Sequence, residues 1–254
     1  MLTSGRRLGA GWDDCRQPAD RDDPPRADRY AVIALTAADR KHLLGYDRGQ
    51  RGLGRRHPLV TSTGTWFHLG VLVFRRTELD NLVEIARTPS EDMRGRFTRL
   101  FDRQELHTVG WCWPVAHVNL SETIRMGTVR GLHYQLPPSA EAKLVTCVRG
   151  TIWDVAVDIR RGSPTFLKWC ARRLSQESLN SMLIPPGFAH GFQALCDDVT
   201  VVYVHSSEYS PADERGIDGT DDRLGIRWPL PVSHRSDRDL SFPRLDVCFA
   251  GVAI

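Results

Sequence analysis

The chain has 254 residues, of which 41% are hydrophobic and 26% charged, a composition typical of a soluble globular protein with a substantial core. Its formal net charge is only +3, from 34 basic and 31 acidic residues, which lacks the basic excess of a dedicated nucleic-acid-binding protein. No apolar stretch approaches the roughly 20 residues of a membrane helix. We therefore expect no nucleic-acid partner, no membrane partner and a cytoplasmic location.

The N-terminal region differs in composition from the rest of the chain. No glutamate precedes Glu78, Lys41 is the single lysine before it, and the stretch 13–29 combines arginine and aspartate with three prolines. Such a composition cannot bury much apolar surface. We therefore predict that residues 1–74 form an N-terminal extension that is disordered or weakly structured.

Two apolar stretches interrupt this extension before the functional domain begins. The stretch 30–44 favours a short helix, and 66–74 favours a strand. We place the boundary near residues 73–76, so that residues 75–250 form the domain that carries the function. The six cysteines are scattered without a C-x-x-C pair, which predicts buried free thiols rather than a zinc site or a disulfide framework.

Short segments rich in β-branched and aromatic residues follow, separated by glycine- and proline-containing turns. They predict strands at 82–85, 97–101, 143–148, 152–159 and 199–204. Only two segments favour short helices, 100–106 and 175–181. Many short strands with few helices indicate an all-β sandwich or barrel.

The segment 151–159 alternates with the two-residue period of a strand. Asp154 and Asp158 share one face with Ile152 and Ala156, whereas Trp153, Val155 and Val157 lie on the other face. Polar groups on one face are typical of a strand that lines a wet cavity or faces solvent.

Two segments combine a histidine with glycines, where the backbone turns tightly and can approach a ligand. They are 127–135, which contains His133, and 184–192, which contains His190. A single histidine is more often structural. Two in similar settings, with Arg130 and Lys143 nearby, make a functional role about as probable as a structural one.

At this point the sequence resembles the dTDP-4-dehydrorhamnose 3,5-epimerase family, enzymes of the cupin jelly-roll class, from about residue 76 to 246. Eight motifs occur in the order and spacing of that family: RGRFTRLFD (94–102), NLS (119–121), GTVRGLHYQ (127–135), AKLV (142–145), DVAVDIRRGSPTF (154–166), IPPGFAHGF (184–192), YSPADERGI (209–217) and LGIRWPLP (224–231). The resemblance implies a cupin-like double-stranded β-helix with short peripheral helices. It also implies a homodimer.

The resemblance further implies cofactor-independent epimerisation of a nucleotide-linked 4-keto-6-deoxyhexose at carbon 3, carbon 5 or both. Inverting such a carbon requires a base on one face, an acid on the other and a donor for the enolate oxygen. The matching residues are His133 as base, Tyr203 as acid and Lys143 as enolate stabiliser. Asp239 matches the carboxylate that holds the histidine and fixes its tautomer.

Further matches concern the nucleotide-sugar substrate. Arg94 and Arg130 match arginines that bind the diphosphate, and Tyr209 matches an aromatic residue that stacks on the nucleobase. The remaining substrate-binding candidates are Asn119, Glu214, His190, Gln135, His117, where relatives carry glutamine, and Arg238, at a lysine-type position.

Three positions depart from the family pattern. Arg99 stands where a glutamate usually faces the thymine, which replaces an acceptor with a donor and leaves the nucleobase open. Val204 replaces a common lysine, and Gly219 replaces a usual tryptophan. None of these changes removes the proposed acid or base. The sequence does not determine which sugar is the substrate or which carbon is inverted.

Two other functions compete with this interpretation. Metal-dependent cupins bind their ion through an H-x-H pair, whereas here His133 is followed two residues later by Gln135, so we expect no metal. A sugar-nucleotide-binding cupin without activity has the same fold. It would not need His133, Lys143, Tyr203 and Asp239 together, which favours the enzyme.

Overall fold

The structure is a computed structural model of the chain and describes residues 66–68 and 70–254. All of them belong to one of the two units into which the chain divides, Ala31–Ile254. The disorder predicted for residues 1–65 and the helix predicted at 30–44 lie outside the described residues.

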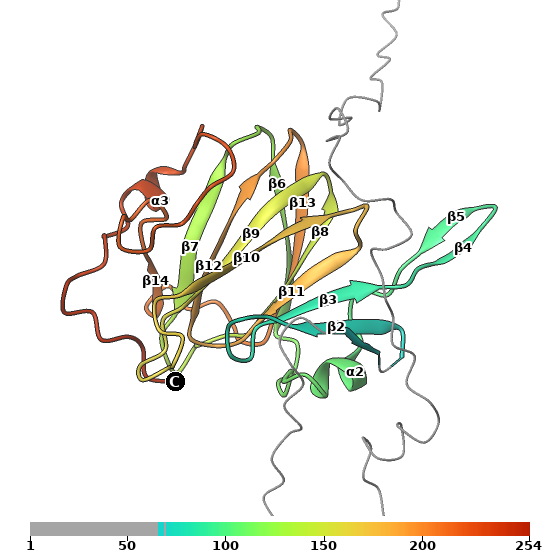
Figure 1. Cartoon of the computed structure of the whole chain (residues 1–254), viewed down its shortest axis with the longest axis horizontal. Helices are drawn as coiled ribbons and strands as arrows, with labels where there is room; N and C mark the ends of the chain where they lie inside the picture. The colour runs from blue at the N-terminus through green and yellow to red at the C-terminus, as the bar shows by residue number, and fades with distance from the viewer. Residues whose placement is uncertain (1–65, 69) are drawn as a thin grey trace, which may run out of the picture. The chain divides into compact units, whose positions relative to one another are not determined.

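The described residues form two large antiparallel sheets (Figure 1). The seven-stranded sheet has the order β1 (Trp66–His68), β2 (Leu72–Arg76), β3 (Val83–Arg87), β11 (Asn180–Ile184), β8 (Lys143–Arg149), β13 (Val199–His205) and β6 (His117–Thr123). The five-stranded sheet has the order β10 (Trp169–Ser175), β9 (Thr151–Asp158), β12 (Phe188–Ala194), β7 (Val129–Gln135) and β14 (Glu214–Gly216). From β7 to β14 the chain passes repeatedly between the sheets, which is the jelly-roll arrangement that the sequence predicts. The all-β, cupin-like fold class is confirmed.

Apolar side chains fill the space between the two sheets and cover their outer faces. The inner cluster takes Val145 and Val201 from the seven-stranded sheet and Ile152 and Phe192 from the five-stranded sheet. Removing one such buried aliphatic side chain costs roughly 2–5 kcal/mol. The sheets are therefore held at a fixed separation, and this separation sets the width of any cavity between them.

Strand β9 is buried on both faces, whereas its alternation predicted a polar face toward a wet cavity or solvent. Ile152 and Ala156 belong to the inner cluster, and Val155 and Val157 pack in a second cluster on the outer face of the five-stranded sheet. The acidic residues of the inner face, among them Asp154, have no solvent exposure. They lie inside the molecule rather than at its surface.

Several predicted strands are confirmed, and four predicted segments differ from the structure. The segments 143–148, 152–159 and 199–204 correspond to β8, β9 and β13, and 82–85 overlaps β3. The strand predicted at 66–74 is two strands, β1 and β2, which form a hairpin. The helix predicted at 100–106 is the single turn α2 (Arg103–His107), which begins after the N-cap Asp102.

The strand predicted at 97–101 is wrong, because only its first residue lies in a strand. The carbonyls of Arg99 and Leu100 accept hydrogen bonds from the buried guanidinium of Arg87 at 3.0 and 2.9 Å. The helix predicted at 175–181 is also wrong. This segment contains the end of β10, a turn and the start of β11, and the Ser175 hydroxyl bonds to that of Ser178 across the turn.

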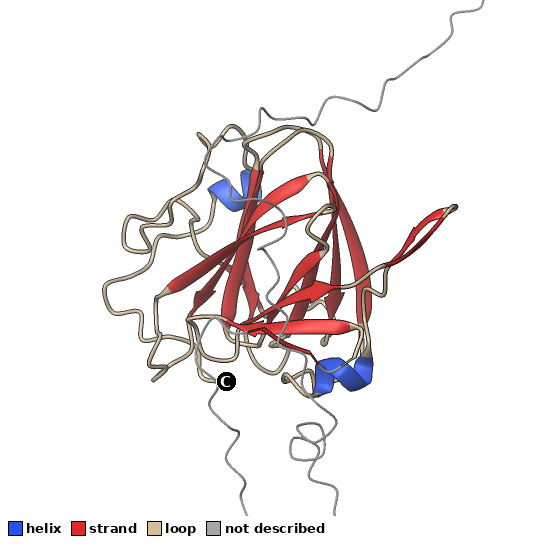
Figure 2. Cartoon of the chain, turned by 45° about the vertical axis from the view of Figure 1, so that its right-hand side comes forward, coloured by secondary structure: helices blue, strands red, loops and turns tan. Residues whose placement is uncertain are grey.

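Two short elements lie at the edges of the sheets. The helical turn α3 (Asp237–Leu240) follows the N-cap Ser236, and Figure 2 shows both short helices at the periphery of the strands. The hairpin of β4 (Ser90–Asp92) and β5 (Gly95–Phe97) is exposed throughout and projects away from the sheets (Figure 1).

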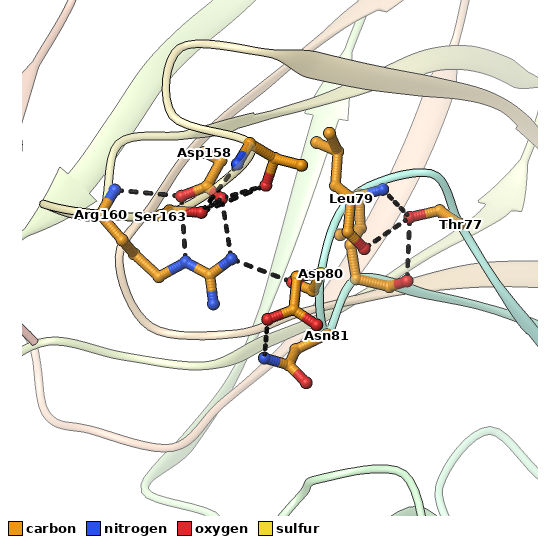
Figure 3. A network of polar contacts seen from close by, with 9 residues as sticks. Thr77, Leu79, Asp80, Asn81, Asp158, Arg160 and Ser163 are labelled. Atoms are coloured by element: carbon orange, nitrogen blue, oxygen red, sulfur yellow. Dashed lines mark hydrogen bonds and ion pairs between the residues drawn. The ribbon is translucent and has the colours of Figure 1, made fainter. Parts of the chain in front are cut away.

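The turn between β2 and β3 is fastened to the end of β9 (Figure 3). The Arg160 guanidinium donates to the Asp80 carbonyl at 3.1 Å and to the Asp158 carboxylate at 2.8 Å. The predicted domain boundary between residues 74 and 75 falls inside β2, where Leu72 and Phe74 are fully buried. The packed sheet thus includes residues that precede this boundary.

Candidate active site

A cavity of about 290 Å³ lies between the two sheets. His133 and His190 reach it from β7 and β12 of one sheet, and Lys143 and Tyr203 reach it from β8 and β13 of the other. Every site residue predicted from the sequence lines this cavity except Arg94, Arg238 and Asp239. Chain segments that are far apart in sequence thus meet around one hollow.

His133 is held from outside the cavity by Asp239 of α3. The Nε2 atom of His133 lies 2.8 Å from Asp239 Oδ1, and Asp239 Oδ2 accepts a hydrogen bond from the Gly131 amide at 3.0 Å. Burial favours a raised pKa for Asp239, but the hydrogen bonds from His133 and Gly131 outweigh it and hold this pKa below its usual value. An ionised carboxylate only accepts, so Nε2 carries the proton and Nδ1 keeps a lone pair.

Tyr203 approaches from the opposite sheet. Its hydroxyl lies 3.2 Å from the hydroxyl of Ser121 on β6, and its ring lies 6.2 Å from the His190 ring. Burial raises the pKa of Tyr203, so the phenol keeps its proton at neutral pH. The cavity thus has an imidazole on one sheet and a protonated phenol on the other.

Lys143 is an almost buried ammonium on the same sheet as Tyr203. Its Nζ lies 3.0 Å from Glu141 Oε1, and both side chains are 9% exposed. The other oxygen of Glu141 lies 2.7 Å from Nδ1 of His205, whose ring stacks on that of His117 at 4.4 Å. Sequence reasoning did not identify Glu141, His205 or Ser121, all of which line the cavity.

His190 has its own carboxylate partner, Asp154 of the adjacent strand β9, at 2.7 Å. The two side chains are 5% and 0% exposed. Sequence reasoning placed Asp154 on one face of its strand but did not pair it with His190. The two-residue period gives the face of a residue, whereas the partner depends on the register between β9 and β12.

At the rim of the cavity, polar contacts hold several predicted substrate-binding residues in place. Arg130 donates to the Thr123 hydroxyl and to a backbone carbonyl of β6, at 2.9 and 2.7 Å. The Tyr209 ring is 55% exposed, and its hydroxyl donates to Glu214 at 2.6 Å. Arg238 forms an ion pair with the same Glu214.

Two predicted residues have contacts that differ from a simple binding role. The Gln135 amide donates to the carbonyls of Ser139 and Glu208 and accepts from the Ser210 amide, so it braces the loops beside the cavity. Arg94 lies on the projecting hairpin, where its side chain is 86% exposed and pairs with Asp92.

Within the part of the chain that the structure describes, no three His, Cys, Asp or Glu side chains are grouped as metal ligands would be. The same residues contain no helix that is long and apolar enough to cross a membrane.

Comparisons with known proteins give one consistent result. The family model described as dTDP-4-dehydrorhamnose 3,5-epimerase matches residues 76–246. A dTDP-4-dehydrorhamnose 3,5-epimerase from Shigella flexneri is 41% identical over 167 residues, which cover 65% of this chain and 92% of the relative.

Solved structures agree with this match. The 3,5-epimerase from Legionella pneumophila, in complex with dTDP-4-keto-L-rhamnose, is 35% identical with a TM-score of 0.66, over 70% of this chain and 94% of that one. The 3'-monoepimerase ChmJ from Streptomyces bikiniensis, in complex with dTDP-quinovose, is 36% identical with a TM-score of 0.62, over 66% and 85% of the two chains. The chain therefore belongs to the dTDP-4-dehydrorhamnose 3,5-epimerase family.

Proposed function

We propose that this protein is an isomerase that epimerises a nucleotide-linked 4-keto-6-deoxyhexose at carbon 3, carbon 5 or both, for deoxysugar biosynthesis and without a cofactor. One observation supports this most strongly. The imidazole of His133 and the phenol of Tyr203 come from opposite sheets and line the same cavity. A base and an acid on opposite sides of one ring are what inversion of a carbon requires.

The proposed reaction begins at a carbon next to the carbonyl. Nδ1 of His133 takes the proton of that carbon, and the C–H electron pair moves into the ring so that the carbonyl becomes an enolate. The Lys143 ammonium stabilises the negative oxygen, and such a charge acts strongly in a site that excludes water. Tyr203 then donates its proton to the other face of the carbon, and the enolate returns to the ketone.

Both groups end the cycle in the wrong protonation state, because His133 has gained a proton from the substrate and Tyr203 has given its own proton to the product. A proton passing from the imidazolium to the phenolate, through solvent or the product, restores the enzyme. Asp239 supports the first step, since its ionised carboxylate holds Nε2–H and stabilises the imidazolium that forms.

We further propose a homodimer in which the hairpin of one protomer completes the site of its partner. Arg94 matches a diphosphate-binding arginine, yet it lies on the projecting hairpin and does not line the cavity of its own chain. Val118 and Leu120 of the edge strand β6 are 59% and 61% exposed, an apolar surface that a second copy can cover. The cytoplasmic location expected from the sequence stays a prediction.

The dimer proposal has a direct test by complementation. Arg94→Ala and His133→Ala proteins, each impaired alone, are mixed and allowed to exchange subunits. If Arg94 acts across the dimer, the mixed dimer contains one complete site and activity returns. If mixing restores nothing, although mass spectrometry shows mixed dimers, Arg94 does not act in the partner's site.

The proposed reaction is tested with dTDP-4-keto-6-deoxyglucose and other 4-keto sugar nucleotides in deuterated water. Proton NMR should show deuterium entering carbon 3, carbon 5 or both, and the labelled positions identify the inverted carbons. Binding of these nucleotides with no exchange at either carbon would instead favour the binding-only cupin.

A further inference from the structure

Beside the proposed acid and base, the cavity contains three linked charged or titratable groups, of which the reaction above uses one. Lys143 Nζ contacts one oxygen of Glu141 at 3.0 Å, and His205 Nδ1 contacts the other at 2.7 Å. All three line the cavity, and their side chains are 9%, 9% and 12% exposed. Lys143, Glu141 and His205 thus form a buried hydrogen-bonded network rather than a contact between exposed side chains.

Glu141 can stabilise Lys143 in two ways, through its charge and by fixing the direction of the ammonium. A buried ammonium is unfavourable unless an opposite charge lies beside it. A lysine side chain is also flexible, so an enolate oxygen meets the ammonium only if something fixes its direction. The carboxylate of Glu141 supplies both the charge and the direction.

The protonation states follow from the surroundings. Burial favours a raised pKa for Glu141, but His205 and Lys143 outweigh it and lower this pKa to about 2. Burial lowers the pKa of His205. At neutral pH an ionised carboxylate therefore accepts from a charged ammonium and from a neutral imidazole that donates through Nδ1.

Other groups face His205 from the strands around it. His117 of β6 stacks on its ring at 4.4 Å, and the Tyr203 ring lies 6.0 Å away on its own strand. Glu208 lies 3.8 Å from His117 Nδ1, and its side chain is 84% exposed. Glu141 is thus the buried carboxylate in direct contact with both Lys143 and His205.

We propose that Glu141 and His205 are positioning residues of Lys143, and that they keep its ammonium charged and aimed at the carbonyl oxygen of the bound sugar. This inference rests on the proposed epimerisation for the role of Lys143. His205 donates to the second oxygen of Glu141 and so fixes the direction in which the carboxylate faces Lys143. The remaining N–H groups of Lys143 stay available to the substrate.

The first experiment reads the lysine directly and needs no turnover. The full chain contains only three lysines, Lys41, Lys143 and Lys168, so NMR of protein with isotope-labelled lysine resolves each side chain. Titration follows their Cε and Nζ signals, and a Lys143→Arg sample assigns the signal. In Glu141→Gln, Lys143 should release its proton at least about one pH unit lower than in the wild type, a tenfold loss of proton affinity.

Glu208→Gln is the matched control, because it also removes one carboxylate near the same histidines but not one in contact with Lys143. It should leave the Lys143 titration where it is in the wild type. An unchanged titration in Glu141→Gln, or an equal shift in both variants, overturns the proposal. Because the signal is independent of the reaction, this result stands even if the wild type exchanges no deuterium and the proposed function fails.

The second experiment tests whether His205 acts through its Nδ1–H hydrogen-bond donor or only through the shape of its ring. Asparagine in His205→Asn can place an amide N–H where Nδ1 lies, whereas His205→Phe keeps a ring without a donor. We expect His205→Asn to retain kcat within about threefold and His205→Phe to lose at least about tenfold in kcat with little change in KM. Equal kcat in the two variants overturns the role of His205.

In Glu141→Gln the basic limb of the kcat–pH profile should move with the Lys143 titration, which a purely structural role would not cause.

Discussion

Two neighbouring histidines of the five-stranded sheet each pair with a carboxylate, and the two pairs differ in solvent access rather than in contact distance. His133–Asp239 and His190–Asp154 have nearly the same separation, 2.8 and 2.7 Å, and the two histidines are register partners across β7 and β12. Yet the His133 side chain is 32% exposed and that of His190 only 5%. A carboxylate orients an imidazole in both pairs, but His133 is much more accessible to a substrate atom than His190.

The origin of each carboxylate explains this difference. Asp154 comes from the neighbouring strand, so its contact with His190 lies within the sheet, where both side chains are buried. Asp239 comes from α3, 106 residues along the chain from His133, and approaches from the edge. The Asp239 carboxylate contacts Nε2 of His133 and does not contact Nδ1. Access, not pairing, therefore distinguishes a proposed base from a supporting histidine.

The largest expected effect tests this difference between the histidines. His133→Ala should reduce deuterium exchange at both carbons by about a thousandfold, because general-base catalysis contributes roughly 10²–10⁴ in rate. The measurement is the initial NMR rate in deuterated water with a saturating 4-keto sugar nucleotide. His190→Asn is the companion variant and should lose far less. An equal loss in both would remove the distinction between the pairs.

Tyr203→Phe should separate the two halves of the reaction. The variant keeps the base, so proton removal and deuterium wash-in should fall by less than about tenfold, whereas net inversion should fall about a hundredfold. Wash-in and the appearance of epimerised product are followed in the same NMR time course. Equal losses of both would count against Tyr203 as the opposing acid.

Asp239→Asn should have a smaller effect on rate, about tenfold, because the asparagine keeps the shape of the side chain but not its charge. The neutral amide no longer fixes one tautomer of His133, and it stabilises the imidazolium less. The rate of wash-in at both carbons measures this loss. Full activity in this variant would show that His133 needs no charged partner.

The motifs predicted this constellation better than they predicted its partners. Lys143 and Tyr203 lie in segments that were predicted as strands, whereas His133 was found through its neighbouring glycines and the motif 127–135, which forms β7. The role of Asp239 as partner of His133 came from the family resemblance alone, since nothing local to that charged segment indicates a buried carboxylate or the helical turn α3.

Glu141 and His205 show what the sequence could not supply. They are 64 residues apart and meet only because β8 and β13 pair in one register, which places Lys143 opposite His205. No local pattern marks such a contact. The wrong strand at 97–101 has a similar cause. Its apolar residues predicted a strand, but no local pattern shows that Arg87, which lies outside this segment, donates to its carbonyls.

The next prediction concerns stability against pH. Hydrogen bonds hold the pKa of Asp239 below its ordinary 3.8, so ionisation of this group favours the folded state. The contribution is complete above the unfolded value and is lost as pH falls through the folded value. Chemical denaturation should therefore show Asp239→Asn about 2 kcal/mol less stable than the wild type at neutral pH, with the difference shrinking below about pH 4. A difference that stays constant to pH 3 would contradict this.

The smallest expected effect is that of a chelator. His133 and His190 each give one ring nitrogen to a carboxylate, and Gln135 occupies the position of the second histidine of an H-x-H pair. Its amide is already bonded to three backbone groups, so it is a poor substitute ligand. Dialysis against EDTA should leave the exchange rate within about twofold of the untreated enzyme. A loss that zinc or manganese restores would mean that the two histidines act together on an ion, and the contrast between an accessible base and a buried pair would no longer describe the site.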